Sequence, residues 1–208
     1  MLFRSFSSNE YNKVPHRQVI WTARLVESEK GIIKFLSIIL DLLLKPNNNI
    51  KIIIVGEGPD RRMISDFLAS NSLNHIVSLK GWVSQNDMIK FYRSSDLFLL
   101  PSVRDQNPLS VIEALWSSLP LMISNRCGNH YEALYGKKNG WLLDIDNEAS
   151  VRSCWQQFSI LNDEELSKMG IESFATANKY FKSEESLNHL IYELTKNGCV
   201  SIPKKQTV

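Results

Sequence analysis

The sequence has few cysteines and histidines, and this scarcity limits the chemistry that it can support. Only three cysteines occur in 208 residues (Cys127, Cys154 and Cys199), an odd number without a C-x-x-C pair. This pattern is typical of reduced thiols rather than of a disulfide framework. The four histidines are dispersed along the chain and do not have the spacing of metal ligands, so we expect no metal site.

Long apolar runs and a strong excess of one charge are also missing. The most apolar segment, residues 35–44, is interrupted by Ser37 and Asp41, whereas a membrane-spanning helix needs about 18 apolar residues or more. The chain opens with no signal-peptide pattern, and we expect a soluble, cytoplasmic protein. A balance of 24 basic and 22 acidic side chains argues against a polybasic segment that binds nucleic acid.

Short apolar segments alternate with helical patterns along most of the chain, which predicts an α/β domain with a doubly wound, mostly parallel sheet. The six segments expected as strands are residues 18–23, 50–55, 75–80, 97–100, 121–124 and 140–143. Helical patterns lie between them, at residues 32–44, 59–69, 85–93 and from 108 onward, and three more follow at about 148–161, 163–181 and 184–196.

The ends of the chain do not share this alternation. Residues 1–17 show neither the helical nor the strand periodicity of apolar residues and are interpreted as a linker or leading arm. Residues 18–197 are expected to form the domain, and residues 198–208 a flexible tail.

A glycine-rich turn follows the second expected strand, at Gly56-Glu57-Gly58-Pro59. A dinucleotide-binding fingerprint needs a third glycine where this chain has Arg61, which argues against NAD binding. The turn is compatible either with a simple strand-to-helix connection or with close approach of the backbone to a ligand.

Two cations follow the first expected strand. Arg24 stands at the strand end and Lys30 just before the next helix, on the side of a doubly wound sheet where ligands bind. They could hold a diphosphate between them. Alternatively, they could be solvated loop charges that pair with Glu27 and Glu29.

The fourth strand leads into a polar loop and a helix that we expect Asn107 to cap, with Pro108 at its first position. A helix start of this kind attracts anions. Asp105 precedes it and Glu113 lies in its second turn, where carboxylates could accept hydrogen bonds from sugar hydroxyls. Because Glu113 interrupts an apolar helix, we expect it to meet a polar partner. The alternative is that Asp105 only helps to cap the helix and Glu113 is a surface residue.

Taken in order, these segments resemble the C-terminal, nucleotide-sugar-binding half of a retaining glycosyltransferase of the GT-B fold, family 4 or glycosyl transferases group 1. The resemblance runs from about Val19 to Leu143. The segments that carry it are 24–31 (RLVESEKG), 56–59 (GEGP), 77–83 (VSLKGWV), 95–102 (SDLFLLPS), 105–113 (an acid at each end, as in E-x7-E), 118–120 (SLP), 128–132 (GNHYE) and 139–142 (NGWL).

The resemblance implies a role for each matching residue. Arg24 and Lys30 would hold the donor diphosphate and stabilise it as it leaves, while Glu113 would accept hydrogen bonds from the ribose. Asp105 stands where the family has its first Glu, which contacts hydroxyls of the transferred sugar, and would complete the catalytic set. The main chain of Trp82 and Val83 would border the base. The remaining donor-binding residues would be Gly56, and Gln106, Asn107, Pro108 and Leu109 along the diphosphate and sugar.

The resemblance also implies substrates and partners. The donor would be a nucleotide-diphosphate sugar, with UDP favoured over GDP, and neither a metal nor another cofactor would be needed. The acceptor would be a saccharide or a lipid-linked molecule in polysaccharide, lipopolysaccharide or glycolipid synthesis, with peripheral contact at the inner face of the membrane. An N-terminal acceptor-binding domain, absent from this sequence, would act in cis or in trans.

Three departures from the family pattern keep other functions open: Ala23 replaces a glycine, Leu119 replaces the glycine before Pro120, and Asn129 replaces the second glycine of G-G-x-x-E. The departures at Leu119 and Asn129, together with Asp105 in place of glutamate, motivate an alternative in which the chain is a non-catalytic interaction subunit derived from such a domain. A nucleotide-sugar epimerase of the same fold is less favoured, because no acid–base pair is evident.

Overall fold

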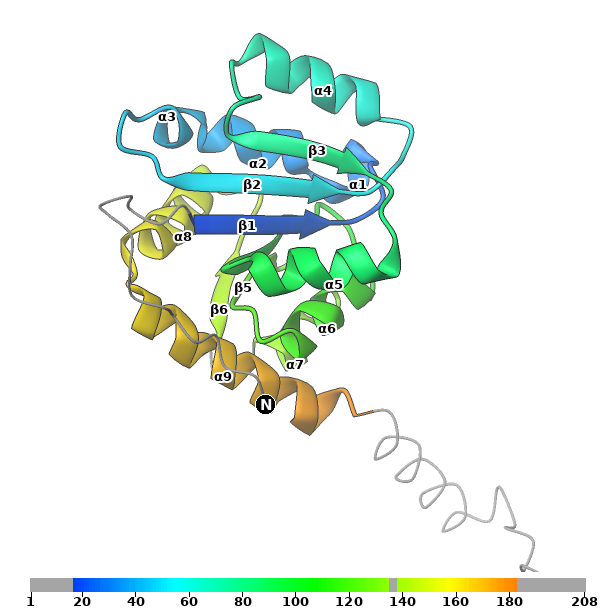
Figure 1. Cartoon of the computed structure of the whole chain (residues 1–208), viewed down its shortest axis with the longest axis vertical. Coiled ribbons are helices and arrows are strands. Elements are labelled where there is room, and N and C mark those ends of the chain that lie inside the picture. Colours follow the sequence, from blue (N-terminus) through cyan, green and yellow to red (C-terminus); the bar gives the residue numbers. More distant parts are fainter. Residues whose placement is uncertain (1–16, 135–137, 183–208) are drawn as a thin grey trace, which may run out of the picture.

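Six strands form a single sheet in the computed structural model, which describes residues 17–134 and 138–182. Their order across the sheet is β3-β2-β1-β4-β5-β6, and every neighbouring pair is parallel (Figure 1). The strands are β1 (Arg17–Thr22), β2 (Ile50–Val55), β3 (Val77–Gly81), β4 (Leu97–Leu100), β5 (Leu121–Ser124) and β6 (Gly140–Leu143). The predicted doubly wound, six-stranded sheet is confirmed.

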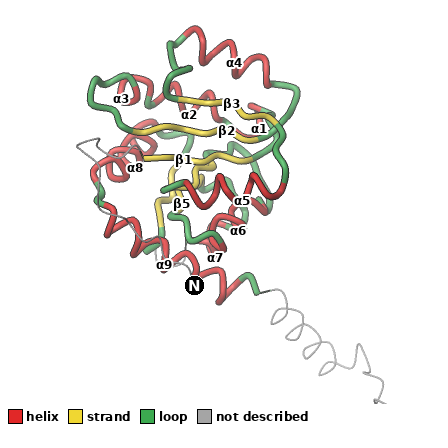
Figure 2. The backbone as a smooth tube through the Cα atoms, viewed as in Figure 1, coloured by secondary structure: helices red, strands yellow, loops and turns green. Residues whose placement is uncertain are grey.

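Helices cover both faces of this sheet, with α5 on the near side and α2 behind it in the view of Figure 2. The helices are α1 (Glu27–Lys30), α2 (Ile32–Ile38), α3 (Leu40–Leu43), α4 (Arg61–Ser70), α5 (Gln85–Ser94), α6 (Leu109–Trp116), α7 (His130–Ala133), α8 (Glu148–Ile160) and α9 (Asp163–Tyr180). Because α8 packs against α2 and β6 while α9 packs against α6 and α7, the C-terminal helices are part of the same core.

The central strands are apolar on both faces because helices cover both of them. All four residues of β4 and of β5 are buried, as are the last four residues of β1. The large side chains of Trp21, Phe35, Phe98, Trp155 and Phe158 fill the layers between sheet and helices. A sheet buried in this way holds its strand ends at fixed positions, which matters for the loops that follow them.

Several helix boundaries differ from the prediction. The helix expected over residues 32–44 is divided at Ile39 (φ −105°, ψ 10°) into α2 and α3, and the one expected from residue 59 begins only at Arg61. Ser84 caps α5 as predicted, accepting a hydrogen bond from the backbone N–H of Asp87.

The predicted cap at Asn107 is wrong. Helix α6 begins at Leu109, the extended Pro108 (φ −66°, ψ 112°) occupies the capping position, and no side chain caps the helix. Asn107 therefore stands one position before the residue that occupies the capping position.

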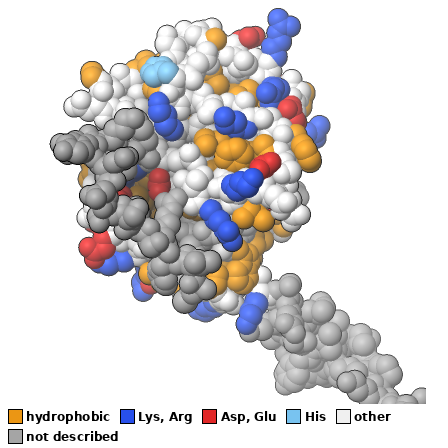
Figure 3. Space-filling view, viewed as in Figure 1, with side chains coloured by type: hydrophobic (Ala, Val, Ile, Leu, Met, Phe, Trp, Pro, Cys, Tyr) orange, Lys and Arg blue, Asp and Glu red, His pale blue; other side chains and the backbone are white. Residues whose placement is uncertain are grey.

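Three predictions fall outside the described residues: the leading arm except for Arg17, the helix at 184–196 and the C-terminal tail. Within the residues that the structure describes, no helix has the length and apolar character required to cross a membrane. Lys and Arg side chains are spread over the face shown in Figure 3 rather than gathered into one basic patch.

Candidate functional site

A cavity of about 490 Å³ opens where β1 and β2 end and α6 begins. The carboxyl ends of parallel strands meet at one edge of a sheet, and this edge is the usual ligand position in doubly wound folds. The cavity is lined by Thr22, Ala23, Arg24, Lys30, Val55, Gly56, Glu57, Met88, Asp105, Asn107, Pro108, Leu109, Ser110 and Glu113.

The structure brings most of the predicted site residues together in this cavity. Eight of them line it: Arg24, Lys30, Gly56, Asp105, Asn107, Pro108, Leu109 and Glu113. They come from the ends of β1 and β2, from α1, and from the loop and helix after β4. Segments that are far apart in the sequence therefore contribute to a single site.

The predicted residues Trp82, Val83 and Gln106 are not part of this lining. Gly81 ends β3 with a positive φ of 74°, and Trp82 beyond it is 79% exposed. The backbone N–H of Trp82 donates to Oε1 of Glu57 over 3.3 Å, so this segment borders the cavity without lining it.

Gln106 lines a second cavity of about 350 Å³, which shares Asn107 with the first. The other residues around it are Gly128, Asn129, Glu132, Tyr180 and Phe181. The side-chain amide of Asn129 donates to the carbonyl of Pro108 over 3.1 Å, and this bond ties the loop after β5 to the start of α6.

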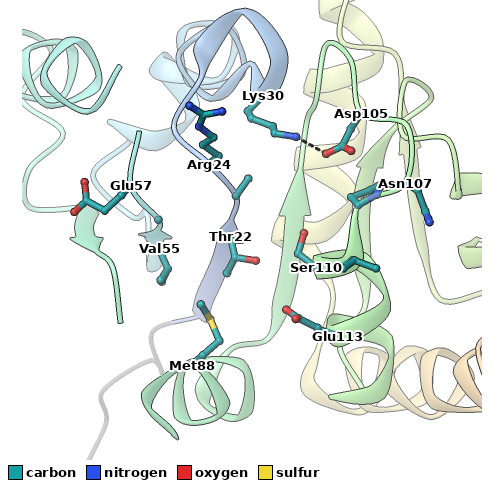
Figure 4. A pocket seen from close by; sticks show the side chains of 14 residues that line it. Thr22, Arg24, Lys30, Val55, Glu57, Met88, Asp105, Asn107, Ser110 and Glu113 are labelled. Carbon is teal, nitrogen blue, oxygen red and sulfur yellow. Dashed lines mark hydrogen bonds and ion pairs between the residues drawn. The ribbon is translucent and has the colours of Figure 1, made fainter. Parts of the chain in front are cut away.

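Lys30 and Asp105 form an ion pair inside the main cavity, with 2.5 Å between Nζ and Oδ2 (Figure 4). Both side chains are largely withdrawn from solvent, at 13% and 14% exposure. The loops that carry them are joined as well, because the carbonyl of Glu29 accepts hydrogen bonds from the N–H groups of Val103 and Arg104. The backbone therefore fixes the position of this pair.

The alternative pairing of the two cations with Glu27 and Glu29 is wrong. The Glu27 carboxylate accepts hydrogen bonds from the N–H groups of Ile33 and Lys34 in the first turn of α2. Burial raises its pKa, while these backbone hydrogen bonds lower it.

The side chain of Arg24 has neither an ion pair nor a hydrogen bond to any other part of the chain that the structure describes. It is exposed and lines the cavity. The Arg24 guanidinium is thus available to an anionic ligand, whereas Lys30 already has a carboxylate partner.

Glu113 lies away from the two cations, near Thr22 and Met88 (Figure 4). The side chain is exposed to the cavity rather than buried, because the apolar side of α6 (Val111, Ala114 and Leu115) is the one that packs into the core. The expected polar partner is present, since the Tyr92 hydroxyl donates to Oε2 of Glu113 over 2.8 Å.

Tyr92 belongs to α5 and is buried, and its hydroxyl also lies 3.0 Å from Oγ1 of Thr22 at the end of β1. Burial raises the pKa of Tyr92 above its usual range, and the nearby Glu113 carboxylate adds to this effect, although the Thr22 hydrogen bond lowers it. The phenol therefore stays protonated and can donate to Glu113.

Gly56 and Gly58 are required by backbone packing. A Cβ atom on Gly56, which has a φ of 148°, would lie 2.0 Å from the carbonyl oxygen of Ala23, and one on Gly58 would lie 2.4 Å from that of Leu25. The glycine turn thus lets the end of β2 touch the segment that carries Arg24. This close contact explains why a G-x-G pattern occurs here without a dinucleotide fingerprint.

Sequence reasoning missed six of the lining residues: Thr22, Ala23, Val55, Glu57, Met88 and Ser110. Thr22 and Val55 are the last residues of β1 and β2, so the rule that ligands bind at carboxyl ends could have found them. Ser110 follows Leu109 in the first turn of α6, where backbone N–H groups have no helical acceptor. No local signal marks Met88, which reaches the cavity only through the packing of α5.

Buried Cys127 lies close to the ion pair, and the loop after β5 that carries it meets the Asp105 loop in a short parallel bridge. Burial raises the pKa of the Cys127 thiol to about 12, with a further contribution from the Asp105 charge. The neutral thiol makes Cys127 a structural residue, and within the described ranges no group of three or more His, Cys, Asp or Glu side chains could hold a metal ion.

The sequence pattern of glycosyl transferases group 1 matches residues 3–172. A putative teichuronic acid biosynthesis glycosyltransferase, TuaC of Bacillus subtilis, is 26% identical over 187 residues, which are 88% of this chain and 43% of that protein. An uncharacterized glycosyltransferase of Methanocaldococcus jannaschii is 26% identical over 147 residues, 71% of this chain and 36% of the relative. The chain thus spans less than half the length of these curated relatives.

Solved glycosyltransferases share the fold. The structure of a mutant of TarM from S. aureus in complex with Fondaparinux, alpha-GlcNAc-glycerol and UDP superposes with a TM-score of 0.73 at 21% identity, over 89% of this chain and 37% of that one. The C-terminal domain of a glycosyl transferase group 1 protein (LpcC) from Francisella tularensis gives 0.68 at 16% identity, over 82% of this chain and 89% of that domain.

Proposed function

The chain belongs to glycosyl transferases group 1, and from this premise we propose that its main cavity binds the nucleoside-diphosphate portion of a sugar donor for retaining glycosyl transfer. UDP is the favoured nucleotide. The observation that carries the proposal is the arrangement of charge: Arg24 and Lys30 lie together, and the Glu113 carboxylate lies apart from them in the same cavity.

A nucleoside diphosphate matches this arrangement. Its phosphates carry negative charge and would lie against Arg24, Lys30 and the first turn of α6, where N–H groups and the helix dipole favour anions. Its ribose carries hydroxyl groups, and a carboxylate such as Glu113 can accept hydrogen bonds from them. One molecule would thus satisfy both ends of the cavity.

The cations would act on the departing group. In the proposed transfer, the bond between the anomeric carbon and the diphosphate oxygen breaks, with its electron pair going to the diphosphate. A bond from the acceptor oxygen to the anomeric carbon forms, and the acceptor proton leaves with the diphosphate. Arg24 and Lys30 would stabilise the charge that develops on that oxygen, which is electrostatic assistance without a metal ion.

Asp105 would have two functions in this scheme. It holds the Lys30 ammonium in the structure, and its second oxygen is available to a hydroxyl of the transferred sugar. Because aspartate is one methylene shorter than glutamate, its backbone must lie close to the sugar. The hydrogen bonds of the Asp105 N–H to the Arg126 carbonyl (3.1 Å) and of the Gly128 N–H to the Asp105 carbonyl (2.8 Å) hold that backbone in place.

The acceptor would be a saccharide or a lipid-linked molecule, bound by an N-terminal-type domain in cis or in trans. A lipid-linked acceptor would place the reaction at the inner face of the membrane, in polysaccharide, lipopolysaccharide or glycolipid synthesis. Leu119 is part of the core and Asn129 bonds to Pro108, so these two departures have structural roles; a non-catalytic interaction subunit is the alternative function.

Thermal-shift and calorimetric titrations with UDP, GDP, ADP and CDP, in buffer containing EDTA, test the proposal. We expect one of these nucleotides to stabilise the chain in proportion to its occupancy, and Arg24→Ala to weaken its binding by about 1.5–3 kcal/mol, the scale of a charge-assisted contact. Arg62→Ala is the matched control, because Arg62 is 94% exposed on α4 and does not line the cavity.

Two results would contradict the proposal. One is that none of the four nucleotides binds. The other is that Arg24→Ala and Arg62→Ala leave the affinity equally unchanged.

A further inference from the structure

Tyr92 does not line the main cavity, yet its hydroxyl contacts two residues that do. The hydroxyl lies 2.8 Å from Oε2 of Glu113 and 3.0 Å from Oγ1 of Thr22. The ring of Tyr92 packs beside Phe98 of β4, with 6.3 Å between the ring centroids. The hydroxyl is thus held by the core rather than by a flexible loop.

The direction of these hydrogen bonds follows from the number of protons available. A carboxylate can only accept, so the single proton of the Tyr92 hydroxyl is directed to Glu113. The Thr22 hydroxyl must then donate to the Tyr92 oxygen. One carboxylate oxygen of Glu113 is engaged in this way, and the other is left to accept from a ligand.

We propose that Tyr92 is a positioning residue that makes the site selective for a ribose with free 2′- and 3′-hydroxyl groups. The inference rests on the proposed function, because it takes the Glu113 end of the cavity as the ribose end. On an exposed helix face, a free glutamate samples several rotamers, and fixing one of them before binding removes part of the entropy cost of binding. The hydrogen bonds that join Thr22, Tyr92 and Glu113 fix the Glu113 rotamer, because Tyr92 is itself held by the core.

The test compares two ligands on the wild-type chain and one variant. UDP and 2′,3′-dideoxyuridine diphosphate are titrated into the wild-type chain and into Tyr92→Phe, which removes only the hydroxyl. We expect Tyr92→Phe to weaken UDP binding about tenfold, the scale of one hydrogen bond to a charged group. The dideoxy analogue should bind both proteins with equal affinity, since it has no 2′- or 3′-hydroxyl that could donate a hydrogen bond to Glu113.

Tyr131→Phe is the matched control, because Tyr131 is exposed on α7 and lines neither cavity. It should leave the affinities of both ligands unchanged. If Tyr92→Phe does not fold, Thr22→Val provides the same comparison with an expected loss of about threefold for UDP alone.

The outcomes separate this inference from the proposed function. If the wild-type chain binds UDP but the variant loses affinity equally for both ligands, or for neither, the positioning role is wrong while the proposed function stands. If the wild-type chain binds no nucleoside diphosphate, the proposed function fails, and the assignment of Tyr92 fails with it.

Discussion

Replacing Lys30 with methionine is expected to weaken UDP binding by about 100-fold. The substitution removes a cation from the site and also leaves the Asp105 carboxylate, 14% exposed, without its partner. That unpaired charge would repel the phosphates at short range. Calorimetric titration of UDP into the wild-type and variant chains measures the loss.

A double variant separates these two contributions. In Lys30→Met/Asp105→Asn the repelling carboxylate is gone, so this double variant should bind UDP about tenfold more tightly than Lys30→Met does. Lys34→Met is the control, because Lys34 is exposed, pairs with Asp146 and does not line the cavity. Equal UDP affinity in the wild-type chain and Lys30→Met would show that the ammonium does not bind the diphosphate.

The second large effect is expected on stability, from Gly56→Ala. The new Cβ would lie 2.0 Å from the Ala23 carbonyl oxygen, at a φ of 148° that side chains rarely adopt. Backbone on both sides would have to move, and β1 and β2 would separate where they carry Thr22 and Val55. We expect a decrease of about 3 kcal/mol in the free energy of unfolding, measured by denaturant titration.

Gly81→Ala is the comparison variant for this prediction. Gly81 also has a positive φ, of 74°, but its new Cβ would meet only the ends of the Glu57 and Arg61 side chains, which can rotate away. Gly81→Ala should lower the free energy of unfolding by about 1 kcal/mol. If both variants lose the same free energy, strain at φ alone accounts for the effect, and close packing of β2 on β1 does not.

Buried strands were the most predictable part of the fold. The runs at 50–55, 97–100, 121–124 and 140–143 have the predicted bounds, because parallel strands covered on both faces must be continuously apolar. Helix starts were less predictable. Whether α6 begins at Pro108 or at Leu109 depends on the backbone angles of a loop fixed by Glu29 and Arg126, which are distant in sequence.

The candidate site could be predicted where strand ends determine it. Arg24, Gly56 and Asp105 each lie within a few residues of a strand end, and the topology alone brings them to one edge of the sheet. Tyr92 could not be found in this way. Its helix α5 carries it to Glu113 through tertiary packing, and nothing in the local sequence distinguishes it from an ordinary core aromatic.

The most direct test of the central claim, that one cavity holds a nucleoside diphosphate between two cations and a carboxylate, is a titration of the ¹⁵N-labelled chain with UDP followed by backbone amide chemical shifts. We predict saturable shifts that are largest at Lys30, Gly56, Leu109, Ser110 and Glu113, all of which line the cavity. Shifts confined to α4 and α8, or no saturable shift at any amide, would contradict the claim.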